Sequence, residues 1–298
     1  MKLRLPATSA NVGPGFDALA LALQLYLEVD AASANHLSIE ATGRNPEICG
    51  ATGNNLLLET YAATLARHGQ AFVPLRLRVH NEIPLGMGCG SSAAVRLAAV
   101  ALAAHFGNLG WSREQILAEA ARLEGHPDNA AACWLGGFVA SAFEGDEVRA
   151  ISIAAPSEWR AIIAMPEEPL GTHASRGLLP EAYARKDVVE NLQRATLLTA
   201  AFASGNGEMI ATAMRDRLHQ PYRAEACPLL PRLLPLAGRS GIAGVALSGA
   251  GPGVLLLTTS ETAASAARPL AERELEGLGK VEFLVCGLEN APVALGRG

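Results

Sequence analysis

Residues 83–94, with the sequence IPLGMGCGSSAA, contain the strongest chemical signal in the chain. Three glycines at alternate positions leave backbone N–H groups uncovered, and the apolar segment that follows predicts a helix whose N-terminal end is partly positive. Such a loop binds an anion such as phosphate, and the hydroxyls of Ser91 and Ser92 can add donors or a ligand for Mg²⁺. A strand-to-helix turn capped by a serine explains the same residues equally well. The Walker A loop and the dinucleotide-binding fingerprint are poor matches, since no lysine is present and the spacing is G-x-G-x-G.

The segment 124–129, EGHPDN, places two carboxylates, an imidazole and an amide within six residues at a predicted helix entrance. Carboxylates beside a phosphate loop are hard oxygen ligands of the kind that Mg²⁺ prefers. Ordinary capping is the alternative, with Asp128 at the positive end of the helix and His126 in a turn. The residues alone leave both interpretations open.

A third glycine cluster, SGAGPG at 248–253, joins two apolar segments. It is long and rich in glycine for a simple hairpin turn. Glycines there permit a close backbone approach to a ligand or to the first glycine loop, which lies at 8–15.

Arg176 and Arg223 lie in the polar segments THASRGLLP and DRLHQPYR. A guanidinium is the side-chain group best suited to gripping a carboxylate through paired donors, although a lone arginine more often forms a surface ion pair. His173 and His219 beside them are not expected to bind a metal, because no pair of histidines has i, i+4 spacing.

The composition excludes several classes of protein. Half of the 298 residues are apolar, 18% are charged and the formal net charge is −5, which favours a folded core over disorder and disfavours a nucleic-acid binder. Five scattered cysteines without a C-x-x-C pair predict neither disulfides nor a zinc site, and Cys89 and Cys133 are interpreted as small apolar residues. No signal peptide or membrane-spanning segment is predicted, so we expect a cytoplasmic protein without a membrane partner.

The patterns of the first half predict alternating strands and helices around these loops. Strands are predicted at 2–5, 25–31, 37–41, 75–80, 138–143 and 148–153, and helices at 55–67 and 113–123. A long helix is predicted after the glycine-rich loop, within 83–106. The segment 8–15 is predicted as a loop with exposed backbone donors. Pro127 is expected in the first turn of a further helix.

The second half predicts an α+β unit. Strands are expected at 161–165, 243–247, 254–259 and 281–286, with helices within 187–238 and at 261–277. This order is ferredoxin-like. With a boundary at 156–158, the chain divides into predicted domains at 1–155 and 156–298.

Taken together, these segments resemble the GHMP kinase superfamily. The resemblance rests on PATSANVGPGFDALALAL at 6–23, IPLGMGCGSSAA at 83–94 and ALSGAGPGVLLL at 246–257. Within that superfamily, SANVGPGFD, EGHPDN, THASR and DRLHQPYR resemble the homoserine kinase family. The resemblance implies an α+β, two-domain GHMP kinase fold: an N-terminal domain like ribosomal protein S5 domain 2 and a C-terminal ferredoxin-like domain, with ATP between them.

The implied reaction transfers the γ-phosphate of ATP to the side-chain hydroxyl of L-homoserine, giving O-phospho-L-homoserine on the way to threonine. The resemblance also makes a homodimer plausible. The alternatives are another small-alcohol kinase of the superfamily, such as one acting on mevalonate, and a nucleotide-binding sensor without turnover.

Roles for individual residues follow from the same resemblance. The residues implied to contact ATP are Asn55, Pro84, Leu85, Gly86, Met87, Gly88, Cys89, Gly90, Ser91 and Ser92, with Asn55 near the base or sugar. Ser92 and Glu124 would hold Mg²⁺. The residues implied to bind homoserine are Asn11, Asp17, Asp128, Thr172, Arg176, Arg223 and Gly249. Asn129 is expected to orient the acceptor hydroxyl, with Glu124 and Asp128 completing the catalytic set and no side chain assigned as a general base. Met87 and Cys89 stand where the family usually has a small residue and leucine.

Overall fold

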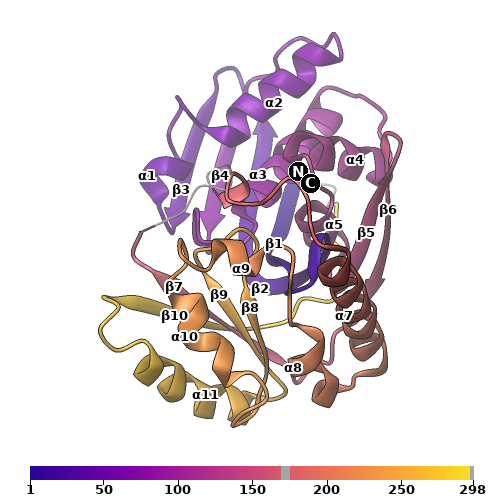
Figure 1. Cartoon of the computed structure of the whole chain (residues 1–298). Helices are drawn as coiled ribbons and strands as arrows, with labels where there is room; N and C mark the ends of the chain where they lie inside the picture. The colour runs from indigo at the N-terminus through magenta and orange to yellow at the C-terminus, as the bar shows by residue number, and fades with distance from the viewer. Residues whose placement is uncertain (169–174, 296–298) are drawn as a thin grey trace.

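The computed structural model describes residues 1–168 and 175–295, which form two sheets with helices packed on them (Figure 1). The first sheet has six strands in the order β3-β4-β2-β5-β6, with β1 paired to β2. Its strands are β1 (Lys2–Asn11), β2 (Gly15–Ser33), β3 (Ser38–Gly43), β4 (Leu75–Asn81), β5 (Phe138–Glu144) and β6 (Glu147–Ile153). The strands predicted in this half are all present.

The prediction of a loop at 8–15 was wrong. Strand β1 continues to Asn11 and β2 begins at Gly15, so only residues 12–14 form the turn. Polar residues persist in this buried strand because they have partners: the hydroxyl of Thr8 binds Asn129, and that of Ser9 binds Ser248. The polar side chains that suggested a loop therefore serve contacts across the molecule.

The helices of the first half pack against its sheet, with the first of them beside β3 (Figure 1). They are α1 (Pro46–Cys49), α2 (Leu56–Arg67), α3 (Ser91–Phe106), α4 (Arg113–Glu124) and α5 (Asp128–Leu135). Helix α3 is rich in alanine and buried over most of its length, which is typical of a helix packed on all sides. Its N-terminus emerges where the two sheets meet.

The second sheet is antiparallel and has the order β10-β7-β9-β8. Its strands are β7 (Arg160–Pro166), β8 (Ile242–Leu247), β9 (Val254–Thr258) and β10 (Val281–Gly287). Its helices are α7 (Arg185–Ser204), α8 (Ile210–Ala213), α9 (Gln220–Arg223), α10 (Leu229–Leu233) and α11 (Glu261–Glu274), with 3₁₀ turns η1 (Gly207–Met209) and η2 (Leu234–Leu236). This arrangement confirms the predicted ferredoxin-like order, while the domain boundary at residue 155 stays a prediction.

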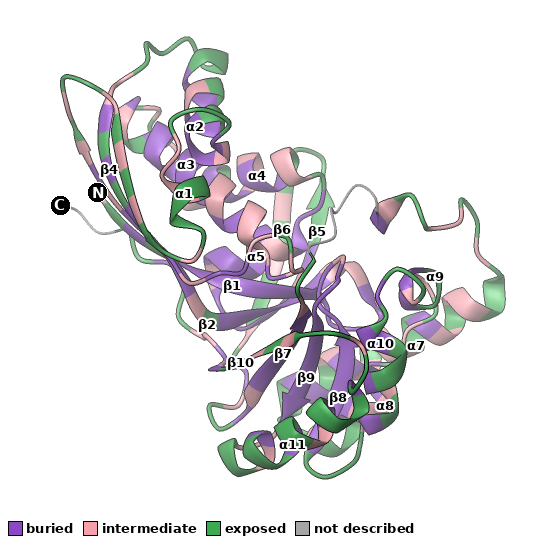
Figure 2. Ribbon diagram, turned by 90° about the vertical axis from the view of Figure 1, so that its left-hand side faces the viewer, coloured by how far each residue is buried: buried purple, intermediate pink, exposed green. Residues whose placement is uncertain are grey.

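One hydrophobic core extends across both halves of the chain, and buried residues continue from the first sheet into β7, β8 and β9 (Figure 2). Phe202 of α7 stacks on Phe138 of β5 with ring centroids 4.0 Å apart. After β10 the chain returns to the first half, where the N–H of Val293 donates to the carbonyl of Trp134 at 3.0 Å. None of the described helices is both long and apolar enough to cross a membrane.

Replacing Phe202 with alanine tests this shared core. Both stacked rings are at most 1% exposed, so Phe202→Ala is expected to lower the free energy of unfolding by about 3–5 kcal/mol through lost burial and a cavity. Leu192→Ala on the same helix is the control, since that side chain is 62% exposed and its loss should cost less than about 0.5 kcal/mol. Equal effects of the two substitutions in urea denaturation would contradict this assignment.

Candidate active site

The glycine-rich loop lies between β4 and α3 in a conformation that favours glycine. Gly86, Gly88 and Gly90 have φ angles of 69°, 76° and 68°, in the left-handed region that disfavours side chains. Gly90 is the N-cap of α3, so a serine cap is excluded and Ser91 and Ser92 lie inside the helix. No acidic residue occupies the first turn, which leaves its positive end available to an anion.

The third glycine cluster packs directly against this loop. A Cβ on Gly88 would lie 2.0 Å from the carbonyl oxygen of Ser248, a separation that no side chain tolerates. The N–H of Gly249 donates to the carbonyl of Ala10 at 3.1 Å. The predicted approach to segment 8–15 is therefore confirmed, at the end of β1, and the cluster contacts the glycine-rich loop at 86–90 as well.

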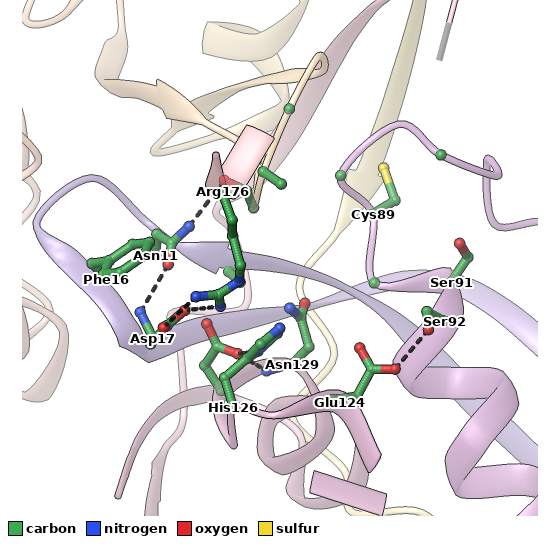
Figure 3. Close-up of a pocket in the computed structure, with 18 of the residues that line it drawn as sticks. Asn11, Phe16, Asp17, Cys89, Ser91, Ser92, Glu124, His126, Asn129 and Arg176 are labelled. Atoms are coloured by element: carbon green, nitrogen blue, oxygen red, sulfur yellow. Dashed lines mark hydrogen bonds and ion pairs between the residues drawn. The ribbon is translucent and has the colours of Figure 1, made fainter. Parts of the chain in front are cut away.

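Ser92 and Glu124, the two predicted metal ligands, lie together. Ser92 Oγ donates to Glu124 Oε1 at 2.6 Å, and both residues line one pocket between the sheets (Figure 3). Glu124 is the last residue of α4, and its side chain is 9% exposed. A hydroxyl and a carboxylate at this separation are suitable oxygen ligands for Mg²⁺.

The segment after Glu124 directs the carboxylate of Asp128 and the amide of Asn129 toward the same pocket. Asp128 is 1% exposed; its Oδ1 accepts the N–H of Asn129 at 2.7 Å and lies 2.6 Å from His126 Nδ1. Burial acts to lower the pKa of His126, but the hydrogen bond and charge of Asp128 outweigh it and raise that pKa. Helix α5 begins at Asp128, so Pro127 is its N-cap and lies one residue before the first turn in which it was predicted.

Asn129 is held by a residue from the first strand. Thr8 Oγ1 donates to Asn129 Oδ1 at 2.6 Å, which leaves the Nδ2 group of the amide to donate toward the pocket. Figure 3 shows Asn129 between Asp17 on one side and Glu124 on the other. An acceptor hydroxyl held here would lie between the two predicted binding regions.

Asp17 and Arg176 form a bidentate ion pair on the other side of the pocket. Arg176 Nη2 lies 2.6 Å from Asp17 Oδ1, and Nη1 lies 3.0 Å from Oδ2. The backbone N–H of Asp17 donates to Asn11 Oδ1 at 3.0 Å, and Asn11 Nδ2 donates to the carbonyl of Gly249 at 2.9 Å. Asn11 and Gly249 therefore position Asp17 through hydrogen bonds that join the two halves of the chain.

Arg223 is a buried cation at the same site, with 1% of its surface exposed. Within the described residues no carboxylate lies within 4.0 Å of its guanidinium; Nη1 donates to His219 Nδ1 at 3.2 Å and Nε to the carbonyl of Ser175 at 3.3 Å. Burial, and then the charge of Arg176, lower the pKa of Arg223. A buried guanidinium without a carboxylate partner favours binding of an anionic ligand group.

Most of the predicted site residues thus share one pocket. Its lining comprises Ala10, Asn11, Phe16, Asp17, Gly86, Gly88, Cys89, Gly90, Ser91, Ser92, Glu124, His126, Asp128, Asn129, Arg176, Arg223 and Gly249, with Ala250 and Gly251 beside them. Leu85 lines a neighbouring apolar cavity of about 210 Å³ together with Ser91 and Ser92. Pro84 and Met87 line neither space, and Thr172 lies outside the described residues.

Asn55 also borders the apolar cavity, but its polar atoms are already used. As N-cap of α2 its Oδ1 accepts the N–H groups of Leu57 and Leu58, and its Nδ2 donates to the carbonyls of Cys49 and Ala51. All four hydrogen-bonding positions of the amide are therefore filled. Binding of a nucleotide by Asn55 stays a prediction. With its amide already hydrogen-bonded, Asn55 could contact a nucleotide only through its apolar atoms.

Cys89 behaves as the packing residue that the sequence predicts. It is 1% exposed, and burial raises the pKa of its thiol to about 12. All five cysteines of the chain are free. The thiol at the phosphate loop therefore stays protonated near neutral pH.

Comparison with known proteins places this geometry in a family. The GHMP kinases N terminal domain model matches residues 55–137, and the GHMP kinases C terminal model matches residues 198–275. The homoserine kinase of Solibacter usitatus is 48% identical over 85% of this chain and 84% of that protein. The chain belongs to the homoserine kinase family. Membership of the GHMP kinases makes it a phosphotransferase that uses ATP.

Further relatives agree with this placement. The homoserine kinase of Synechocystis is 37% identical over 90% of this chain and 89% of that protein. The crystal structure of homoserine kinase from Cytophaga hutchinsonii has a TM-score of 0.81 at 24% identity, covering 99% of this chain and 96% of that one. At that identity the structural match supports the fold alone.

Two residues that line the pocket of this homoserine kinase family member, Phe16 and His126, were missing from the predicted site, as was Thr8, which lies behind the lining. Thr8 holds Asn129. His126 was considered only as part of EGHPDN, with a place in a turn as the alternative. The centre of the Phe16 ring lies 5.5 Å and 5.4 Å from the guanidinium carbons of Arg176 and Arg223. Phe16 directly precedes Asp17, a residue predicted to bind homoserine, and this adjacency in the sequence could have identified Phe16 as a site residue. Nothing in the sequence alone links Thr8 to residue 129.

His219 gives the site a pH dependence that can be measured. Its Nδ1 accepts from Arg223 and its Nε2 lies 2.8 Å from the carbonyl of Gly13, which is the neutral Nε2–H form. Burial lowers the pKa of His219; Arg223 acts in the same direction, while Asp216 opposes it. The ordinary pKa is about 6.5. A depressed folded-state pKa contributes stability above that value, and the contribution is lost as the pH falls below it.

Urea denaturation from about pH 8 to about pH 5 checks this. Wild-type protein is expected to lose more stability below about pH 6.5 than His219→Gln, because glutamine keeps a donor for Gly13 and has no proton to bind. Parallel pH profiles of the free energy of unfolding for the two proteins would rule out His219 as the source of the pH dependence.

Proposed function

We propose that this protein transfers the γ-phosphate of ATP to the side-chain hydroxyl of L-homoserine, forming O-phospho-L-homoserine in threonine biosynthesis. Its similarity to the homoserine kinases of Solibacter usitatus and Synechocystis supports the substrate. The observation that carries the proposal is a single pocket that joins a phosphate loop to a paired carboxylate and guanidinium. Such a pocket suits a kinase whose acceptor is a small zwitterion.

The nucleotide end of the pocket supports ATP binding by backbone groups. The glycines of the loop and the first turn of α3 would bind the phosphates, and the apolar cavity beside Leu85 would receive the base. Ser92 and Glu124 would hold Mg²⁺, which when bound neutralises charge on the phosphate oxygens. Their oxygens, 2.6 Å apart, fit this use.

The other end suits an amino acid. Asp17 and Arg176 neutralise each other in the free chain, and a zwitterion can exchange into this pair, with its ammonium on Asp17 and its carboxylate on Arg176 and Arg223. A hydroxy acid such as mevalonate would free Asp17 from Arg176 and supply no cation in return. The paired charges therefore favour homoserine over the rival substrate class.

Asn129 would hold the acceptor hydroxyl between these two ends. Because Thr8 occupies Oδ1, the Nδ2 group is directed to donate to the hydroxyl oxygen. Phosphoryl transfer has a loose transition state, so orientation and charge neutralisation supply most of the catalysis without a strong base. Asp128 would fix Asn129 through its backbone N–H and would face the ammonium group with Oδ2.

Release of ADP from MgATP tests the proposal, with L-homoserine, L-serine, L-threonine, mevalonate or no acceptor. Turnover selective for L-homoserine is expected. Turnover with another alcohol would leave a kinase with a different substrate, and ATP binding without turnover would favour a sensor.

Substituting Asp17 tests the ammonium site. Asp17 has a φ of 56°, which asparagine tolerates, so Asp17→Asn should keep the turn while removing the charge. We expect kcat/KM for L-homoserine to fall about tenfold to a hundredfold, the loss for a charged hydrogen bond, with the KM for ATP unchanged. Asp30→Asn is the matched control, because Asp30 lies in the same strand and pairs with Lys2 outside the pocket. An equal effect at both positions would refute the role of Asp17.

Thr8 and Asn129 give a second test. Asn129→Ala should lower kcat, and Thr8→Val should lower it about tenfold by releasing the amide oxygen. If Thr8 acts through Asn129, the double variant is no slower than Asn129→Ala alone. Thr64→Val is the control, since its hydroxyl binds only within α2. Full turnover by a folded Asn129→Ala protein would remove Asn129 from the mechanism.

A further inference from the structure

A guanidinium already lies against the predicted metal ligand Glu124. Arg96 Nε is 2.6 Å from Glu124 Oε1 and 3.4 Å from Ser92 Oγ. Arg96 follows Ser92 by four residues on α3, so both side chains lie on one face of that helix. The pair is largely shielded from water, with side-chain exposures of 25% for Arg96 and 9% for Glu124.

The contacts divide the two carboxylate oxygens of Glu124. Oε1 accepts the hydrogen bond from Ser92 and forms the ion pair with Arg96. For Oε2, no hydrogen-bond partner is present within residues 1–168 and 175–295, and Figure 3 shows this oxygen directed away from Ser92. One oxygen is thus fixed by the protein while the other stays available to a ligand in the pocket.

The position of Glu124 in the fold requires a nearby positive charge to stabilise its carboxylate. It ends α4, and the C-terminal end of a helix is partly negative, so a carboxylate there is disfavoured. Arg96 borders a groove between α2, α3 and α4. Arg67 and Arg122 border this groove as well, but both pair with Glu119. Among the described residues, Arg96 is the arginine that neutralises Glu124.

We propose that Arg96 is a positioning residue for the metal site: it fixes Glu124 through Oε1 and supplies, in the metal-free protein, the positive charge that Mg²⁺ supplies in the loaded one. The proposal rests on the proposed function, because it assumes that Ser92 and Glu124 hold the metal. It predicts that Arg96 weakens metal binding by competing for the charge of Glu124, while keeping the carboxylate correctly turned.

Binding of Mn²⁺ without nucleotide, followed by electron paramagnetic resonance, gives the readout. Arg96→Met leaves Glu124 as a buried charge without its partner, so we expect Mn²⁺ to bind about tenfold more tightly than in wild-type protein, equivalent to about 1.4 kcal/mol. The melting temperature of this variant should fall without metal and should rise with Mg²⁺ by more than that of wild-type protein. Arg96→Lys keeps the charge and should retain the wild-type affinity.

Two control variants separate this role from simple packing. Arg122→Met removes an arginine from the same groove that does not contact Glu124, and should leave Mn²⁺ affinity unchanged. Adding Arg96→Met to Glu124→Gln should leave Mn²⁺ affinity at the value of Glu124→Gln alone, because the carboxylate for which arginine and metal compete is gone. If Arg96→Met does not fold, Arg96→Gln removes the same charge in a smaller change.

The outcomes distinguish the two proposals. Tighter Mn²⁺ binding in Arg96→Met that disappears in the Glu124→Gln background supports the role of Arg96. Equal affinity in wild-type and Arg96→Met, with a loss of stability that Mg²⁺ does not reverse, overturns it and leaves the metal site intact. Wild-type Mn²⁺ binding, with or without ATP, that is insensitive to Glu124→Gln would overturn the metal site itself and this inference with it.

Discussion

Backbone contact between the phosphate loop and residues 248–253 determines the shape of the pocket. A Cβ on Gly253 would lie 2.4 Å from the carbonyl oxygen of Met87, and one on Gly88 would lie 2.0 Å from that of Ser248. The two loops come from different sheets, so the absence of side chains at these points lets the sheets close on each other. The two ends of the pocket meet through that approach, because Asp17 and Glu124 come from one half of the chain and Arg223 from the other.

Two ion pairs neutralise acidic side chains of the pocket before any ligand binds, whereas the buried cation Arg223 has no carboxylate within 4.0 Å among the described residues. Asp17 pairs with Arg176, and Glu124 pairs with Arg96. Arg223 is buried against His219, whose neutral form accepts its hydrogen bond. Because buried charges are costly unless paired, these contacts let the free protein keep a polar cavity without unfolding it. The same contacts fix where each side chain points.

The sequence predicted the order of the elements well, because hydrophobic periodicity and glycine are local signals. The resemblance named Ser92 and Glu124 as metal ligands; their side chains lie together in the structure, and the metal itself stays a prediction. Sequence prediction failed where a residue's role depends on a distant partner. Thr8 looks like a loop residue until Asn129, a residue far away in the sequence, is placed beside it. Local pattern cannot report whether a polar group is already satisfied by the fold.

Two of the ion pairs have a common consequence for selectivity. A ligand that brings one charge breaks a pair and leaves its other member uncompensated, whereas a ligand that brings both charges replaces the whole pair. In the proposed function, the Asp17–Arg176 pair would therefore discriminate by the number of charges on the acceptor, independently of its length. At the Arg96–Glu124 pair, a divalent ion would bring more charge than the guanidinium with which it competes, and it would bind through Oε2 while Arg96 stays on Oε1. In the proposed function, paired charges that a ligand must equal or exceed would thus make both ends of the pocket selective before any chemistry begins.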